Sequence, residues 1–195
     1  MAEMMKGNEA IAEAAIRAGA RFYAGYPITP SSEIMEYLSW RMNEVGGAFV
    51  QAESELAGIN MVIGASSCGV RALTASSGPG ISLKQEGIST LCDEGLPAVV
   101  ITQVRYGNGL GTLFTSQCDY HRETRGGGQG DYRCIVLCPS SIQEFVDLML
   151  PAYELAEKYR IVTIMMGEGT LGQMMEPVEL PDFVEPKRTP WALNG

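Results

Sequence analysis

Short apolar runs alternate with segments whose apolar residues recur at helical spacing along most of the chain. The clearest run is Pro97–Val104, whose alanine, valine and isoleucine residues are typical of a parallel strand buried on both faces. The predicted strands are Phe22–Tyr26, Ala48–Ala52, Val70–Ala75, Pro97–Val104, Arg133–Leu137 and Ile161–Met166. Because parallel strands need crossover connections, this alternation predicts an α/β fold: a doubly wound, mostly parallel six-stranded sheet with helices on both faces.

Helical spacing and capping residues define the segments between these strands. Asn8 is expected to cap a first helix that ends at Gly19, and Ser31 or Ser32 to cap a second one. The remaining predicted helices are Glu55–Ala65, Ile81–Leu91 and Ile142–Tyr159. Residues 105–132 are rich in glycine, serine, threonine and charge and show no period, which is typical of a functional or disordered segment.

The composition and charge of the chain narrow the possible function classes. The net charge of −9 argues against a nucleic-acid partner, because phosphate binding needs a basic surface. No run approaches the roughly 18 apolar residues of a membrane span, and the N-terminus lacks the apolar core of a secretion signal, so we expect a cytoplasmic protein without a membrane partner. The five cysteines are expected to be free thiols, with Cys134 and Cys138 serving as small apolar residues of a buried strand rather than as metal ligands.

Four polar or glycine-rich segments follow predicted strands and should meet at one edge of the sheet, where ligands of open parallel sheets bind. They are Tyr26–Glu33, Ala52–Glu55, Ser76–Gly80 and Arg105–Thr112. Neither Ser76–Gly80 nor the glycines at 107, 109 and 111 have the spacing of a phosphate or dinucleotide fingerprint, which disfavours a nucleotide-binding enzyme.

The residue chemistry of each segment leaves two interpretations open. Tyr26–Glu33 is either a proline-stiffened turn with a serine-capped helix or a site for an anion such as a carboxylate. Glu55 is either stabilised by the helix dipole or bonded to a ligand nitrogen in a water-poor cleft. Arg105 is either a surface residue or, with Thr112, a partner for a carboxylate, whereas His121 is expected to be a solvated loop residue.

Several motifs, spaced in the same order, together resemble one family. Residues 26–33 read Tyr-Pro-Ile-Thr-Pro-Ser-Ser-Glu and match the signature of the 2-oxoacid:ferredoxin oxidoreductases. The segments 7–10, 51–57, 74–80, 126–133 and 136–144 follow in family order, so the resemblance extends from about Gly7 to Gly195. Residues 109–112 and 116–120 are most similar to the 2-oxoisovalerate members.

The resemblance implies part of a multi-subunit enzyme that oxidatively decarboxylates a 2-oxoacid, forms an acyl-CoA and passes electrons to ferredoxin. The chain resembles the N-terminal, pyrimidine-binding domain of the alpha-type subunit, which shares thiamine diphosphate with a diphosphate-side (beta) subunit. That partner would hold the diphosphate and magnesium, so no metal is expected on this chain. Gamma and ferredoxin-like subunits would complete the complex, with iron–sulfur clusters outside this chain. Alone, the chain should be inactive.

The resemblance also implies roles for single residues. Glu55 takes the position of the catalytic glutamate that hydrogen-bonds the aminopyrimidine ring, while Glu53 falls two residues short of it. Pro27 and Ile28 are implied cofactor contacts. Thr29, Arg105 and Thr112 are the implied contacts to the substrate carboxylate.

The sequence departs from the family pattern in three places. Residues 106–108 are Tyr-Gly-Asn where relatives tend to have Gly-Gly-Pro, and Gln129 and Cys118 replace an expected histidine and glycine. Residues 1–175 are expected to form the cofactor domain and 176–195 a linker toward a second domain. The chain is then a fragment, a truncated form or a separately encoded domain. The alternative function is a non-catalytic assembly domain, which the intact Thr29, Glu55 and Arg105 disfavour.

Overall fold

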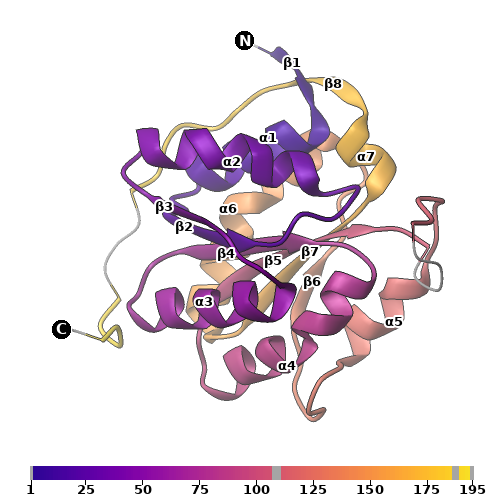
Figure 1. The fold of residues 1–195 in the computed structure, drawn as a ribbon. Helices are drawn as coiled ribbons and strands as arrows, with labels where there is room; N and C mark the ends of the chain where they lie inside the picture. The colour runs from indigo at the N-terminus through magenta and orange to yellow at the C-terminus, as the bar shows by residue number, and fades with distance from the viewer. Residues whose placement is uncertain (1, 107–110, 186–188, 194–195) are drawn as a thin grey trace.

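A six-stranded, fully parallel β-sheet lies at the centre of the protein, as a computed structural model shows for residues 2–106, 111–185 and 189–193 (Figure 1). Its strand order is β3-β2-β4-β5-β7-β6. The strands are β2 (Phe22–Gly25), β3 (Ala48–Gln51), β4 (Ala72–Ser76), β5 (Ala98–Val104), β6 (Ile135–Leu137) and β7 (Val162–Glu168). The predicted α/β architecture is confirmed, and the observed strands lie within two residues of the predicted ones at nearly every end.

Helices cover both faces of this sheet (Figure 1). The helices are α1 (Gly7–Arg17), α2 (Ser32–Glu44), α3 (Glu55–Ser67), α4 (Pro79–Asp93), α5 (Cys118–Arg125), α6 (Ile142–Tyr159) and α7 (Gly169–Gln173). One hydrophobic core joins α1, α2 and α6 to the sheet, and a second joins α3 and α4 to its opposite face. Alternate residues of a strand enter opposite cores, as Val99 and Val100 of β5 do, because side chains alternate across a pleated sheet.

Helix α6 shows how local sequence sets an element. Its N-cap Ser141 accepts a 3.1 Å hydrogen bond from the amide of Glu144, and its C-cap Arg160 is left-handed. Phe145 and Met149 on its apolar face are fully buried, and their packing holds the helix against the sheet. The observed bounds are those predicted from the sequence.

A small antiparallel ribbon joins two segments from opposite ends of the chain. Strand β1 (Glu3–Lys6) pairs with β8 (Met175–Val178), and neither strand was predicted. The boundary expected between residues 175 and 176 lies inside β8. Beyond this strand the chain still contacts the domain, since the amide of Val184 donates a 2.7 Å hydrogen bond to the carbonyl of Arg17.

Three further expectations are wrong. Asn8 lies inside α1, whose N-cap is Lys6, and its side chain bonds distant residues instead of capping the helix. Ser31 is the N-cap of α2, but its hydroxyl donates to the carbonyl of Ile28 rather than accepting from the helix. The aperiodic segment 105–132 contains a helix, α5.

The cysteines also differ from expectation in their burial. None of the five described cysteines forms a disulfide, as predicted. Strand β6 is, however, an edge strand of intermediate burial, and Cys138 is exposed beside it because no further strand covers that edge. Cys134 is partly buried, with its sulfur 3.7 Å from that of Cys92.

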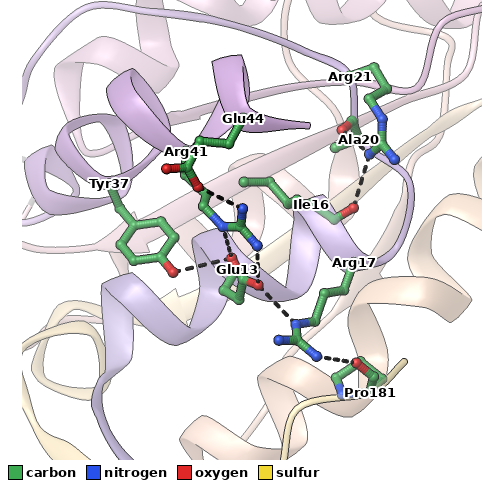
Figure 2. Close-up of polar contacts among 9 residues, drawn as sticks. All are labelled: Glu13, Ile16, Arg17, Ala20, Arg21, Tyr37, Arg41, Glu44 and Pro181. Atoms are coloured by element: carbon green, nitrogen blue, oxygen red, sulfur yellow. Dashed lines mark hydrogen bonds and ion pairs between the residues drawn. The ribbon is translucent and has the colours of Figure 1, made fainter. Parts of the chain in front are cut away.

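Charged side chains join α1 to α2 around one buried carboxylate (Figure 2). Glu13 is 3% exposed and accepts hydrogen bonds from Arg17, Arg41 and Tyr37. Burial alone would raise the pKa of Glu13, but the hydrogen bonds from Arg41 and Arg17 hold it below its ordinary value. Neighbouring positive charge therefore keeps this carboxylate ionised inside the fold.

Two kinds of feature are absent from the described residues. None of their helices combines the length and apolarity that crossing a bilayer requires. Their histidine, cysteine, aspartate and glutamate side chains form no group of three that could bind a metal ion.

Candidate functional site

The loops that follow β2, β3, β4 and β5 meet at the carboxyl edge of the sheet. Arg105, directly after β5, donates a 2.8 Å hydrogen bond from Nη1 to the carbonyl oxygen of Thr29, after β2. A Cβ built on Gly78, after β4, would lie 3.0 Å from Arg105 Nε. A Cβ on Gly80 would lie 2.5 Å from Glu55 Oε1. These contacts bring the four predicted segments into one site.

Glu55 is the buried carboxylate of this site. It is the first residue of α3, it is 6% exposed, and the preceding Ser54 caps the helix by accepting a 3.2 Å hydrogen bond from Ala57. The helix dipole stabilises a negative charge at this position. Gly80 allows the carboxylate to approach the start of α4, since any larger side chain there would collide with it. Glu53, the other glutamate considered for this role, is exposed. Burial therefore distinguishes Glu55 from Glu53.

Several buried polar atoms around Glu55 and Arg105 have no hydrogen-bond partner within the described part of the chain. They are the hydroxyls of Ser76 and Ser77 and Nε of Arg105. The Ser76 hydroxyl lies close to the Glu55 carboxylate, because a Cβ on Gly80 would collide with both. An unsatisfied buried polar group costs about 1–3 kcal/mol, so polar ligand atoms at this site would relieve a real deficit.

A buried amide holds the loop that carries Thr29. Asn8 Nδ2 donates to the carbonyl of Pro30 at 2.7 Å and to Oε2 of Glu33 at 2.8 Å, and its Oδ1 accepts a 3.0 Å bond from Gln103. Asn8 is fully buried. Sequence reasoning missed this residue because an asparagine at a helix start is also a normal cap.

Helix α5 places a second group of charges beside the site. Arg122 bonds the carboxylates of Asp119 and Glu123 on its own helix and also donates to the carbonyl of Gly78 at 3.2 Å. Burial raises the pKa of Glu123 to about 7 even though Arg122 is adjacent. The signal for this helix was the spacing of charges at residues 119, 122 and 123, which places them on one helical face.

The other candidate residues are less constrained. Pro27 and Ile28 are half-buried in the turn before Thr29, which is itself exposed. Thr112 is half-buried, but residues 107–110 of the same segment lie outside the described residues, and with them most of the Gly107–Gly111 pattern. His121 is exposed, as expected, but it lies on helix α5 and not in a loop, with its ring 5.6 Å from that of Tyr120.

One cavity lies apart from Glu55. It has a volume of about 530 Å³ and opens between the ends of β5, β6 and β7 and the segment 115–120. Its lining includes Val104, Tyr120, Cys138 and Glu168 but none of Thr29, Glu55 and Arg105. Buried polar side chains with atoms that lack hydrogen-bond partners among the described residues lie instead at the β2–β4 side of the same edge. We therefore locate the candidate site at these buried polar side chains and not at the cavity.

Known proteins share this fold and sequence. Residues 13–190 match the family described as pyruvate flavodoxin/ferredoxin oxidoreductase, thiamine diphosphate-binding. The ketoisovalerate oxidoreductase subunit VorB of Methanothermobacter marburgensis is 51% identical over 195 residues, covering 99% of this chain and 55% of that protein. The 2-oxoglutarate synthase subunit KorA of Methanocaldococcus jannaschii is 46% identical over 184 residues, covering 94% of this chain and 50% of that protein.

A solved structure agrees with these relatives. The 2-oxoglutarate:ferredoxin oxidoreductase from Magnetococcus marinus, with 2-oxoglutarate, coenzyme A and succinyl-CoA bound, superposes on all of this chain with a TM-score of 0.90 and 32% identity. The match covers 34% of that chain, and this chain spans about half the length of the curated relatives above. The chain belongs to the pyruvate flavodoxin/ferredoxin oxidoreductase family and carries its thiamine diphosphate-binding domain.

Proposed function

We propose that this chain supplies the pyrimidine side of a thiamine diphosphate site in a 2-oxoacid:ferredoxin oxidoreductase. The observation that carries the proposal is the buried carboxylate of Glu55, held at the start of α3 and in close contact with Gly80. A carboxylate in this setting suits a ring nitrogen that must share a proton with it. The unpartnered hydroxyls of Ser76 and Ser77 add polar atoms that a bound ring could satisfy.

Glu55 acts on the cofactor by placement and by control of a proton. When bound, thiamine diphosphate supplies the electron sink for loss of carbon dioxide from the 2-oxoacid. Glu55 accepts the hydrogen bond of the aminopyrimidine ring and holds the proton at that ring nitrogen. The half-buried Pro27 and Ile28 provide apolar contacts to the ring from the neighbouring loop. Because Glu55 is buried, this charge-assisted hydrogen bond would be stronger than it would be in solvent.

The substrate side of the proposal rests on Arg105. Its Nη1 is occupied by the Thr29 carbonyl, and its Nε faces Gly78 without a partner among the described residues. A guanidinium held in this way presents its remaining donors to a carboxylate. Thr29 and Thr112 add hydroxyls from either side, so the 2-oxoacid carboxylate would bind between the loops after β2 and β5. The identity to VorB favours 2-oxoisovalerate as the substrate.

The rest of the reaction belongs to other subunits. A diphosphate-side (beta) subunit would carry the diphosphate and magnesium. Gamma and ferredoxin-like subunits with iron–sulfur clusters would pass electrons to ferredoxin, and coenzyme A would accept the acyl group.

The test replaces Glu55 in the full protein that contains this chain, assembled with its diphosphate-side partner. We expect Glu55→Gln to lower 2-oxoacid-dependent reduction of an electron acceptor by about two orders of magnitude, the usual range for a positioned proton-transfer group. Glu53→Gln is the matched control, because it removes the same charge two residues away at an exposed position. Equal activity of the two variants would overturn the assignment of Glu55.

A further inference from the structure

One lysine of the domain is fully buried beside the candidate site. Lys84 of α4 is 0% exposed, and its Nζ donates a 3.3 Å hydrogen bond to the main-chain carbonyl of Glu55. Gly58, one turn further along α3, makes room for it, since a Cβ there would lie 3.3 Å from Nζ. The ammonium therefore lies against the first turn of α3, behind the residue whose carboxylate faces the site.

Burying the charged side chain of Lys84 costs free energy. A buried ammonium is stable only if it is paired and hydrogen-bonded, and the one hydrogen bond found for Lys84 in the described structure goes to a neutral carbonyl. Burial lowers the pKa of Lys84 to about 8, and the negative charge of Glu55 is the influence that opposes this. An apolar side chain of the same length would stabilise the fold better. Packing thus gives no sufficient reason for a lysine at this position.

The electrostatic effect between Lys84 and Glu55 is reciprocal. Among the described residues, Glu55 is the ionisable group whose charge acts appreciably on Lys84. Because the attraction between opposite charges acts on both, the ammonium of Lys84 also attracts the carboxylate of Glu55. The helix dipole at the start of α3 acts in the same direction.

We propose that Lys84 is a positioning residue for the cofactor glutamate. Its ammonium fixes the main chain of Glu55 and attracts the carboxylate that would accept the hydrogen bond of the aminopyrimidine ring. The inference rests on the proposed function of Glu55 and adds a residue of α4 that does not touch the cofactor. It predicts that cofactor activation depends on Lys84 while cofactor affinity and fold stability do not.

The experiment uses Lys84→Met in the full protein assembled with its partner subunit. The first measurement is the exchange of the reactive thiazolium proton of bound thiamine diphosphate for deuterium, read by NMR after acid quench. The other two are the dissociation constant of the cofactor and the midpoint of thermal unfolding. We expect exchange to slow about tenfold, because the attraction of one neighbouring unit charge in a partly screened interior is worth about that factor. The dissociation constant should stay within about twofold and the midpoint should be equal or higher.

Two further variants and one control separate the possible outcomes. Lys84→Gln keeps a donor for the Glu55 carbonyl without the charge, so it should be as slow as Lys84→Met; restored exchange would overturn the electrostatic role. Lys158→Met removes an exposed lysine and should change nothing. In a Glu55→Gln background, Lys84→Met should add no further loss.

The failure of this inference can be told from the failure of the proposed function. Normal exchange in Lys84→Met together with slow exchange in Glu55→Gln removes the role of Lys84 alone. Normal exchange in Glu55→Gln removes the cofactor role of Glu55 and the inference with it. A large loss of thermal stability in both Lys84 variants would assign the residue to the fold and overturn the proposal.

Discussion

Arg105 Nη1 lies 2.8 Å from the carbonyl oxygen of Thr29, so a single hydrogen bond joins the end of β5 to the signature loop after β2. The contact uses the main chain of Thr29 and leaves its hydroxyl free to face a ligand. It also fixes the orientation of a guanidinium that is 5% exposed. The two predicted substrate residues are therefore neighbours that hold each other in place.

Replacing Arg105 by lysine should weaken substrate binding more than cofactor binding. Lysine keeps the charge but cannot bond the Thr29 carbonyl and a carboxylate in the same fixed geometry. We expect KM for the 2-oxoacid to rise about 10- to 100-fold, the value of one to two charge-assisted hydrogen bonds. Arg125→Lys, at an exposed position on α5, is the matched control. An unchanged KM in Arg105→Lys would exclude Arg105 as the carboxylate partner.

Replacing Asn8 by alanine should destabilise the domain. The change removes bonds to Pro30 and Glu33 and leaves the amide of Gln103 without an acceptor in a buried position. We expect a loss of about 3 kcal/mol in the free energy of unfolding, measured by denaturant titration. Asn60→Ala removes one exposed side-chain bond, to the carbonyl of Leu56, and should cost less than about 1 kcal/mol. Similar losses in the two variants would contradict the supporting role of Asn8.

Glu13 should make stability depend on acid pH (Figure 2). Its folded pKa lies below the ordinary value of 4.5, so its contribution is complete above about pH 4.5 and is lost as pH falls through the folded pKa. Glu13→Gln should lower the free energy of unfolding by about 2 kcal/mol at pH 7, because Arg17 and Arg41 lose their charged partner. The difference from the wild-type protein should shrink below pH 4. A constant difference between pH 7 and pH 3 would mean that the ion pairs contribute no stability.

Glu123 should have the opposite pH dependence. Its folded pKa is raised to about 7 from 4.5, so the wild-type protein is most stable, relative to a neutral variant, below about pH 4.5 and loses stability as pH rises through 7. Glu123→Gln should remove this loss, which is on the order of 3 kcal/mol. The measurement compares unfolding free energies of both proteins at pH 5 and pH 8. Parallel values at the two pH values would show that Glu123 does not titrate in this range.

The sheet and the long helix were predictable because their signals are local and apolar. Val99, Val100 and Ile101 enter two hydrophobic cores, and helix α6 combines a serine cap with one apolar face. Periodicity of apolar residues reports this kind of burial directly. For the same reason the carboxyl edge of the sheet, where we place the candidate site, followed from the parallel direction of the predicted strands.

The missed features depend on contacts that periodicity does not report. The buried residues of α5 are Asp119 and Glu123, so charge pairing with Arg122 takes the place of an apolar face. Asn8 looks like a cap in the sequence, and only its distance to Pro30 shows otherwise. The burial of Glu55 depends on the approach of Gly80 from the loop after another strand, which the sequence does not report. For the same reason the sequence did not show that Glu53 is the exposed one of the two.

The β1–β8 ribbon makes the signature loop mechanically sensitive to the far end of the domain. Strand β8 pairs with β1, and β1 continues directly into α1, whose Asn8 bonds the carbonyl of Pro30. Pro30 follows Thr29, whose carbonyl is held by Arg105. A pull on the segment after Val178 would therefore reach both implied substrate residues through one ribbon and two hydrogen bonds.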